Sequence, residues 1–198
     1  KISNNEEFNS LLNRNLLYTL FFSTGLTIDT EERVIVTSRS PKYYVSAAYW
    51  DRDSLLWAFP AIVNADKDVA REILEYITTI QSKNIGIHSR FIDGTILEPG
   101  FELDELCSFI IALDYYIQKT NEYDILDDYN TKALIKKILR ILKSKKSESL
   151  LLYETFLQPT DDMRTYPYLT YNNVLVWKVF QILEQWNFDN KEFYYQKE

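Results

Sequence analysis

The amino-acid sequence predicts an all-α fold, an array of αα-hairpins. Apolar residues recur at helical spacing in several separate segments, and the four glycines and five prolines of the 198 residues fall mainly between those segments. No pair of segments shows the alternating pattern of a strand ladder. Hydrophobic residues make up 46% of the chain, enough for a core and too many for wholesale disorder. We expect residues 1–198 to form a single region.

The first element is a predicted helix over residues 6–22. Gly25 offers a stop for this helix. Its apolar residues follow a roughly helical spacing: Phe8, Leu11, Leu12, Leu16, Tyr18 and Leu20. Residues 27–40 are β-branched and polar, with the apolar run 34–36 at their centre. This composition predicts a short strand or an extended segment.

The next two predicted helices span residues 53–63 and 66–81. Only Asn64-Ala65 separates them, so we expect them to form an antiparallel αα-hairpin. Pro60 lies inside the first helix and is expected to kink or end it, because proline lacks an N–H and its ring clashes with the preceding turn.

A long irregular loop is expected over residues 84–100, followed by a strong helix over residues 102–120. The loop holds Pro99 and three of the four glycines in the chain: Gly86, Gly94 and Gly100. The helix carries an apolar stripe of the kind that faces a core. Long ordered loops are often functional, so this loop is a candidate site.

The last third of the chain predicts two more helices. Residues 130–142 are expected to form an amphipathic helix with lysines on its solvent-exposed face, and residues 143–149 are expected to be a solvated turn. Residues 153–173 are expected to be a loop, and residues 174–186 a helix. The tail over residues 188–198 is expected to be loosely held.

Composition excludes several classes of function. With 22 Lys and Arg against 29 Asp and Glu, the formal charge of −7 argues against a nucleic-acid partner. The single cysteine, Cys107, excludes an internal disulfide framework and a Cys-rich zinc site, and the single histidine, His88, excludes a His-His metal pair. No apolar run reaches the ~18 residues that cross a bilayer, and no segment resembles a secretory signal. We therefore expect a cytoplasmic protein without a membrane partner.

Aromatic residues and carboxylates gather in the predicted loops. Aromatic faces stack on the C–H faces of sugar rings, while acids and arginines hydrogen-bond to sugar hydroxyls, so this mixture is typical of carbohydrate sites. The four segments that hold it are Tyr49-Trp50-Asp51-Arg52-Asp53, Ile87-His88-Ser89-Arg90-Phe91, Phe101-Glu102-Leu103-Asp104-Glu105 and Gln158-Pro159-Thr160-Asp161-Asp162.

Three of these segments resemble one family of glycosidases. Residues 50–54 resemble the Trp-x-Arg-Asp-Ser signature of six-hairpin, or (α/α)6-barrel, glycosidases, which glucoamylases and glycogen-debranching enzymes share more loosely. Residues 101–107 are similar to the Trp-Glu-Leu-Asp-Ser-Leu-Cys segment of glycoside hydrolase family 125, the metal-independent α-mannosidases. Residues 158–162, with Tyr166, Tyr168 and Asn173, are similar to that family's Arg-Pro-Ser-Asp-Asp…Tyr-x-Tyr-Leu…Asn stretch.

The resemblance implies an active site at one end of a twelve-helix toroid. It implies that Arg52 and Asp53 hold the terminal sugar, that Asp104 is the general acid, and that Asp161 and Asp162 line the pocket. The family works without a metal ion, so we expect no metal and no other cofactor.

The remaining candidates have weaker support. Glu102 is the rival to Asp104 as the acid, although both could simply complement a helix dipole as acids of the first turn. Trp50, His88, Arg90, Tyr168 and Asn173 complete the predicted substrate-binding set. A hydrogen-bonded structural role is the main alternative for His88, a helix cap for Asp53, and packing for the tyrosines. Phe101 and Gln158 replace the family's Trp and Arg, which leaves the sugar and linkage open.

The length of the chain predicts about half of such a toroid, since twelve helices need roughly twice as many residues. We expect an exo-acting, inverting glycoside hydrolase on an α-linked oligosaccharide, with the general base outside this chain. The remaining half of the barrel, or a second copy of the chain, is then the expected partner. The alternative is a non-catalytic helical module that assembles with a partner chain, and lyase or epimerase chemistry on the same toroid is a third possibility.

Overall fold

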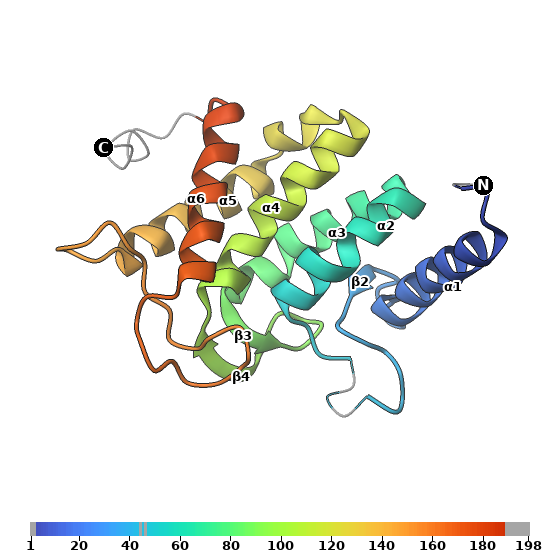
Figure 1. Cartoon of the computed structure of the whole chain (residues 1–198), viewed down its shortest axis with the longest axis horizontal. Helices are drawn as coiled ribbons and strands as arrows, with labels where there is room; N and C mark the ends of the chain where they lie inside the picture. Colours follow the sequence, from blue (N-terminus) through green and yellow to red (C-terminus); the bar gives the residue numbers. More distant parts are fainter. Residues whose placement is uncertain (1–2, 44, 46, 189–198) are drawn as a thin grey trace.

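Six α-helices dominate the part of the chain that the computed structural model describes, residues 3–43, 45 and 47–188 (Figure 1). The α-helices are α1 (Glu6–Ser23), α2 (Phe59–Ala65), α3 (Lys67–Thr79), α4 (Leu103–Thr120), α5 (Tyr129–Lys145) and α6 (Thr170–Gln185). A π-helix, η1 (Arg52–Ala58), and two 3-10 helices, η2 (Gln81–Asn84) and η3 (Tyr123–Asp127), lie between them. The predicted all-α class is confirmed.

Helix α4 forms the centre of the core. Thirteen of its eighteen residues are buried, including every residue of its first two turns from Leu103 to Ile110. α6, η1 and α2 pack directly against it, and α3 and α5 flank it (Figure 1). Because the first turns of α4 are covered on all sides, acidic residues placed there are removed from water.

The predicted hairpin of two helices is confirmed, with Asp66 as its hinge. Asp66 ends α2 and caps α3, since its side chain accepts hydrogen bonds from the backbone N–H groups of Asp68 and Val69. The helix before the hinge differs from the prediction. It begins one residue earlier, at Arg52, and its first seven residues are π-helical.

Pro60 explains the π-helical turn. In a regular α-helix its ring would clash with the carbonyl group four residues earlier. Here Phe59 donates its N–H to the carbonyl of Ser54, five residues back, and Pro60 lies in the first turn of α2. The wider winding carries the chain past the proline, so Pro60 does not end the helix, which was one of the two effects expected of it.

The described residues include two small antiparallel sheets, one of which corrects a predicted irregular loop. The predicted loop over 84–100 is wrong, because β3 (Ile87–Arg90) and β4 (Ile96–Phe101) form a hairpin there. Its turn requires Gly94, which has φ +80° and where a Cβ atom would lie 2.4 Å from the carbonyl oxygen of Ile80.

The first sheet contains the short strand that was one of the two alternatives predicted for residues 27–40. β1 (Thr24–Leu26) pairs with β2 (Arg33–Ile35), with Thr24 opposite Ile35. α1 ends at Ser23, so Gly25 belongs to β1 and is not the helix stop.

The later boundaries also shift. α5 continues to Lys145, into the predicted turn, and α6 begins at Thr170, within the predicted loop. The loop between them folds back on itself through isolated bridges that join Lys146 to Tyr153 and Leu157 to Met163. Of the predicted loose tail, residues 189–198 lie outside the described residues.

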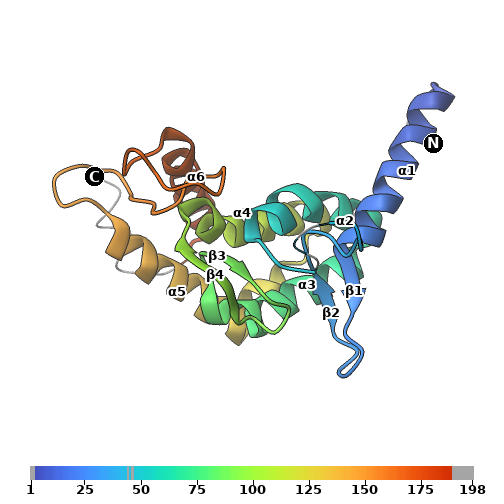
Figure 2. The same ribbon diagram turned by 90° about the horizontal axis from the view of Figure 1, so that it is seen from below.

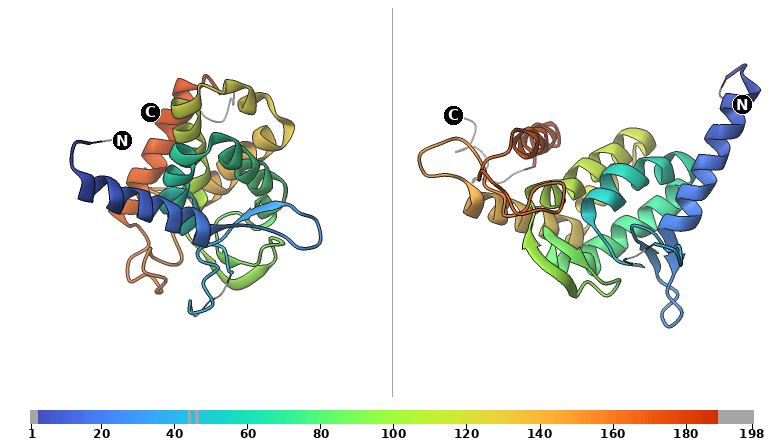
Figure 3. Two further views of the ribbon diagram at one scale, coloured as in Figure 1. Left: turned by 90° about the vertical axis from the view of Figure 1, so that its right-hand side faces the viewer. Right: turned by 60° about the horizontal axis from the view of Figure 1, so that its bottom comes forward.

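Helix α1 projects from the rest of the molecule (Figures 2 and 3). Only Ser23 of this helix is buried. Five large apolar side chains on it are exposed: Phe8, Leu11, Leu17, Tyr18 and Phe21. Within the described residues, none of the helices combines the length and the apolar character needed to span a bilayer.

Candidate active site

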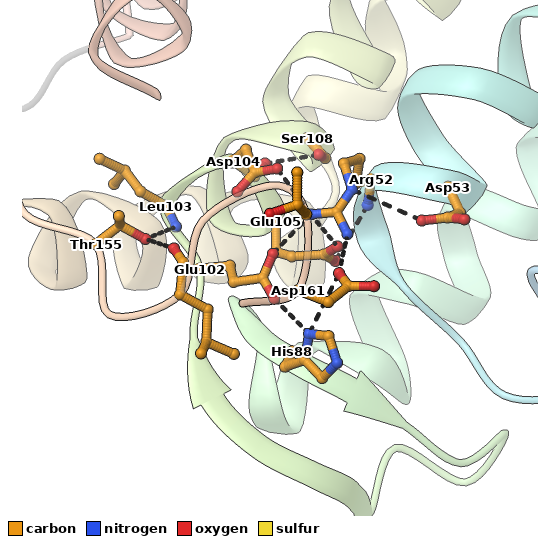
Figure 4. A network of polar contacts seen from close by, with 12 residues as sticks. Arg52, Asp53, His88, Glu102, Leu103, Asp104, Glu105, Ser108, Thr155 and Asp161 are labelled. Carbon is orange, nitrogen blue, oxygen red and sulfur yellow. Dashed lines mark hydrogen bonds and ion pairs between the residues drawn. The ribbon is translucent and has the colours of Figure 1, made fainter. Parts of the chain in front are cut away.

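The candidate site forms where η1, the β3–β4 hairpin and the start of α4 meet (Figure 4). Tyr49 and Arg90 exchange backbone hydrogen bonds of 2.9 and 3.0 Å, which ties the segment before η1 to β3. Glu102 donates its N–H to the carbonyl of Gly86 at 3.0 Å, which fixes the start of α4 beside the same strand. These bonds bring three of the four predicted segments together.

Arg52 lies at the centre of the site. Its Nη1 donates to Glu102 Oε2 at 2.6 Å and to Asp104 Oδ2 at 2.9 Å. Its Nη2 donates to Asp161 Oδ1 at 2.7 Å. Asp53 Oδ2 lies 3.8 Å from Nε. The guanidinium therefore joins the first motif to the other two, as the predicted common site requires.

Glu105 is a further acid of this cluster that the sequence analysis did not select. Its Oε2 accepts the backbone N–H of Arg52 at 3.1 Å, and its Oε1 lies 3.5 Å from Arg52 Nη1. Arg52 and its acidic neighbours Glu102, Asp104 and Glu105 are almost or completely buried. One buried cation thus faces five carboxyl groups, counting Asp53 and Asp161.

His88 forms the other side of the site. Its Nδ1 is hydrogen-bonded to Glu102 Oε1, and its Nε2 lies 3.3 Å from Glu98 Oε2. Asp161 Oδ1 is 3.9 Å from Nδ1. The ring of Trp50 meets the imidazole edge to face, with 5.6 Å between the ring centroids. Trp50 and His88 therefore lie together with Arg52, as predicted.

Arg90 lies behind the site and not in it. It has no exposed surface, and its Nη2 pairs with Asp51, whose other oxygen accepts the Tyr49 hydroxyl at 2.6 Å. Its Cζ is 4.8 Å from the centroid of the Tyr49 ring. Its partners Asp51 and Tyr49 give Arg90 a supporting position, and its contact with substrate stays a prediction.

Three other predicted residues lie outside the cluster. Asp162 is exposed and accepts a hydrogen bond from the Thr160 hydroxyl at 2.9 Å. Asn173 accepts the N–H of Tyr153 at 2.8 Å and so fastens the start of the 153–169 loop. Tyr168 lines an apolar groove of about 290 Å³ together with Asn173. None of the three contacts Arg52 or Asp104 within the described residues.

Burial and like charge raise the pKa values of several carboxyls in the site. Burial raises the pKa of Asp104, although Arg52 opposes it. Burial, with the charges of Asp51, Glu102 and Asp104, holds the pKa of Glu105 well above its ordinary value. The pKa of Asp53 is also raised, mainly by burial. A single guanidinium does not neutralise this many acids, so the site favours protonated carboxyl groups.

His88 responds to the same acids in the opposite sense. Burial alone would lower the pKa of His88, but the hydrogen bond and charge of Glu102, with Asp161 and Glu98, raise it overall. The surrounding acids therefore favour the imidazolium form of His88 more than water does.

Four buried polar atoms of the site have no hydrogen-bond partner among the described residues: Oδ1 of Asp104, Oε1 of Glu105, Nε of Arg52 and Nε1 of Trp50. A buried polar group without a partner is costly, and such groups gather at functional sites. Asp104 and Glu105 therefore both combine a raised pKa with an oxygen that accepts no hydrogen bond, the two properties of a proton donor. Both oxygens of Glu105 face Arg52, whereas only Oδ2 of Asp104 pairs with it.

The geometry would also allow a metal ion at one edge. Ligand atoms of His88, Glu102 and Asp161 all lie within 4.8 Å of one another. Arg52 already donates hydrogen bonds to both carboxylates, at 2.6 and 2.7 Å. A cation at this edge would meet the positive charge of that guanidinium, so the arrangement favours the arginine.

Comparison with known proteins gives a fold and no family. No protein-family model matches the chain, and no curated protein matches it. Among solved structures, the chain is similar to a metal-independent alpha-mannosidase of Streptococcus pneumoniae, described as a non-productive substrate complex with alpha-1,6-mannobiose. The identity is 18% and the TM-score 0.73, over 96% of this chain and 56% of that chain. The likeness confirms the predicted fold, a hairpin array matching part of an (α/α)6 toroid, and the chain spans little more than half of that structure.

Proposed function

We propose that this chain forms the acid-bearing side of the active site of an inverting glycoside hydrolase that removes sugars from the end of an α-linked oligosaccharide. Asp104 acts as the general acid and protonates the oxygen of the leaving sugar. The observation that carries the proposal is the buried cluster around Arg52, in which Asp104 has a raised pKa and an unpartnered Oδ1. The likeness to an alpha-mannosidase supports this class of reaction.

Glu102 is the weaker candidate for the acid. One of its oxygens pairs with Arg52 and the other with His88, so both oxygens already have a partner. Asp104 uses only Oδ2 in an ion pair with Arg52. Glu102 is therefore better suited to hold Arg52 and His88 in place than to give up a proton.

The other site residues receive roles from their positions. Arg52 and Asp53 bind hydroxyl groups of the terminal sugar, and Trp50 and His88 line the same pocket. Asp104 has no exposed surface in this structure, so sugar reaches it after the covering side chains move. Asp161 is the outermost partner of Arg52, with its side chain 50% exposed, and is the first group that an entering sugar would replace.

The base that activates water lies outside this chain in our proposal. Inverting enzymes keep the two carboxyl groups ~6.5–9.5 Å apart to leave room for water, and the acids around Arg52 are all bound to one guanidinium. The remaining half of the barrel, or a second copy of the chain, supplies the base and the opposite wall. The cytoplasmic location stays a prediction.

The experiment that tests the role of Asp104 uses two substrates with different leaving groups. In the assembled enzyme, Asp104→Asn should lower turnover of an α-linked disaccharide by about 10²-fold or more, because protonation of the leaving sugar is lost. The dinitrophenolate group of a dinitrophenyl glycoside departs without needing a proton, so this second substrate should be hydrolysed almost normally. Sugar binding, measured by calorimetry, should be retained.

The matched control is Asp114→Asn, the same change at another largely buried acid of α4. It lies more than two turns from Asp104 and should leave both substrates unaffected. If Asp104→Asn keeps full turnover of the disaccharide, or loses both substrates equally, Asp104 is not the acid.

A non-catalytic assembly module is the second candidate, and α1 is the observation in its favour. Five large apolar residues of this helix are exposed and only Ser23 is buried. An apolar helix of this kind is typical of a surface that another helix covers. Light scattering combined with product analysis separates the two functions, since a module assembles with its partner and releases no sugar.

A further inference from the structure

Trp57 is a large exposed side chain at the edge of the site that the proposed chemistry does not use. Its indole is 63% exposed, whereas Arg52, five residues earlier in η1, is 3% exposed. The centroid of the Trp57 ring lies 6.0 Å from Cζ of Arg52, at the outer limit of a cation–π contact. The indole therefore borders the buried polar cluster while most of its surface faces outward.

The π-helical turn is what places Trp57 there. In an α-helix, side chains three and four residues apart lie together. In η1 the hydrogen bonds connect residues five apart, so the side chains of Arg52 and Trp57 approach each other. Single π-helical turns occur frequently at functional sites. Pro60, which favours this winding, thus helps to bring an aromatic ring to the rim.

We propose that Trp57 stacks on the leaving sugar, the ring on the solvent side of the bond that is cleaved. This inference rests on the proposed function and adds a residue that determines specificity. In an exo-acting enzyme the terminal sugar lies deepest, beside Arg52 and Asp53, and the next sugar lies nearer to solvent. Trp57 is the exposed aromatic group in contact with Arg52 on that outward side. Its indole face suits the C–H face of a pyranose ring.

Binding of short sugars to the assembled enzyme tests this role. All variants carry Asp104→Asn, so that binding is measured without turnover. The probes are α-1,6-mannobiose and maltose, each compared with the methyl α-glycoside of its terminal sugar, which lacks the second ring. Trp57→Ala should weaken binding of the disaccharide about tenfold and change binding of the methyl glycoside by less than about twofold. Trp57→Phe, which keeps an aromatic face, should recover most of the loss.

Trp177→Ala is the matched control. Trp177 is 59% exposed on α6 and lines a separate groove with Leu152 and Tyr168. Its removal should leave both kinds of probe unaffected. Both tryptophans are exposed, so their variants should fold, which far-ultraviolet circular dichroism checks.

Each remaining outcome overturns the proposal in a distinguishable way. If the assembled enzyme with Trp57 intact binds a disaccharide and Trp57→Ala binds it equally well, Trp57 does not stack on sugar and the proposed function is untouched. Equal losses from Trp57→Ala and Trp177→Ala would also reject a specific role. If the assembled enzyme with Trp57 intact binds none of the probes, the proposed function fails, and this inference, which rests on it, fails with it.

Discussion

Two arginine-centred networks in this protein use the same residue types with opposite results. Arg52 is buried and joins five carboxyl groups. Arg71, on α3, is partly exposed and pairs with Glu75, Glu122 and Asp124. Glu122 also receives a hydrogen bond of 2.6 Å from the side chain of Lys67. Cations and acids are therefore nearly balanced in the second network and strongly unbalanced in the first.

The comparison shows how the balance of charge and the access to water decide what a network does. Lys67, the Tyr116 hydroxyl and Arg71 lower the pKa of Glu122 to about 2, so this acid stays charged and clamps α3 to the segment after α4. In the buried network, burial outweighs Arg52 and raises the pKa of Asp104. The Arg71 network is typical of a structural clamp, and the Arg52 network of a site that holds a proton.

The largest difference between the two networks is expected in the loss of stability when the central arginine of each is removed. Arg52→Met leaves several carboxyl groups buried without their cation and should cost about 3–5 kcal/mol in the free energy of unfolding. Arg71→Met affects groups that water can solvate and should cost at most about 1 kcal/mol. Urea denaturation at neutral pH measures both.

An Arg52→Met variant that does not fold at all is consistent with the larger loss. Equal losses from the two variants would contradict the distinction between the networks. Arg52→Lys, which keeps a cation but loses the forked geometry, should fall between wild type and Arg52→Met.

The pH dependence of stability should have opposite signs in the two networks. The folded pKa of Glu105 is raised, so the folded state binds its proton more tightly, and its contribution to stability is lost as the pH rises above its ordinary value of 4.5. The folded pKa of Glu122 is lowered to about 2, so its contribution is present above pH 4.5 and is lost as the pH falls toward 2.

The variants Glu105→Gln and Glu122→Gln test these signs in urea denaturation over a pH series. Relative to wild type, Glu105→Gln should gain stability as the pH rises above 4.5, because an amide has no proton to lose. Glu122→Gln should be less stable than wild type at neutral pH and should approach it as the pH falls. The same trend in both variants would show that the two acids experience similar surroundings.

The smallest effect is expected at the exposed end of the Arg52 network. Asp161 has φ +67°, a left-handed conformation that asparagine adopts readily. Asp161→Asn removes only a half-exposed charge and should cost less than about 1 kcal/mol. Asp161→Ala adds backbone strain and should cost about 1 kcal/mol more. Thermal unfolding compares the two, and an asparagine variant as damaged as Arg52→Met would place Asp161 inside the buried network.

Much of the fold follows from local patterns in the sequence. The apolar stripe over 102–120 and the hairpin at Asp66 depend on short-range spacing and a cap, and both are present. The β3–β4 hairpin was missed because β4 contains Glu98, Pro99 and Gly100 and has no alternating pattern. Its pairing depends on contacts with β3, which periodicity does not report. The π-helical turn was missed because its cause, Pro60, predicts a break as readily as a change of winding.

The site could be predicted where a motif specified it. Arg52, Glu102, Asp104 and Asp161 do lie together, although three separate segments supply them. Glu105 was missed because an acid in a first helical turn is usually solvated, and only tertiary packing shows that this turn is covered on all sides. The position of Arg90 could not be predicted for a related reason, since the sequence does not show that Asp51 holds it behind the site.

The most direct test of the account is the titration of individual carboxyl groups by carbon-13 nuclear magnetic resonance. The account predicts that Asp104 takes up its proton above the ordinary aspartate pKa of about 3.9, while Glu122 titrates near 2. Asp104→Asn and Glu122→Gln assign the two signals. A normal or lowered pKa for Asp104 would contradict the claim that the buried acids outnumber what Arg52 can neutralise, and would remove the proton that the proposed hydrolysis requires.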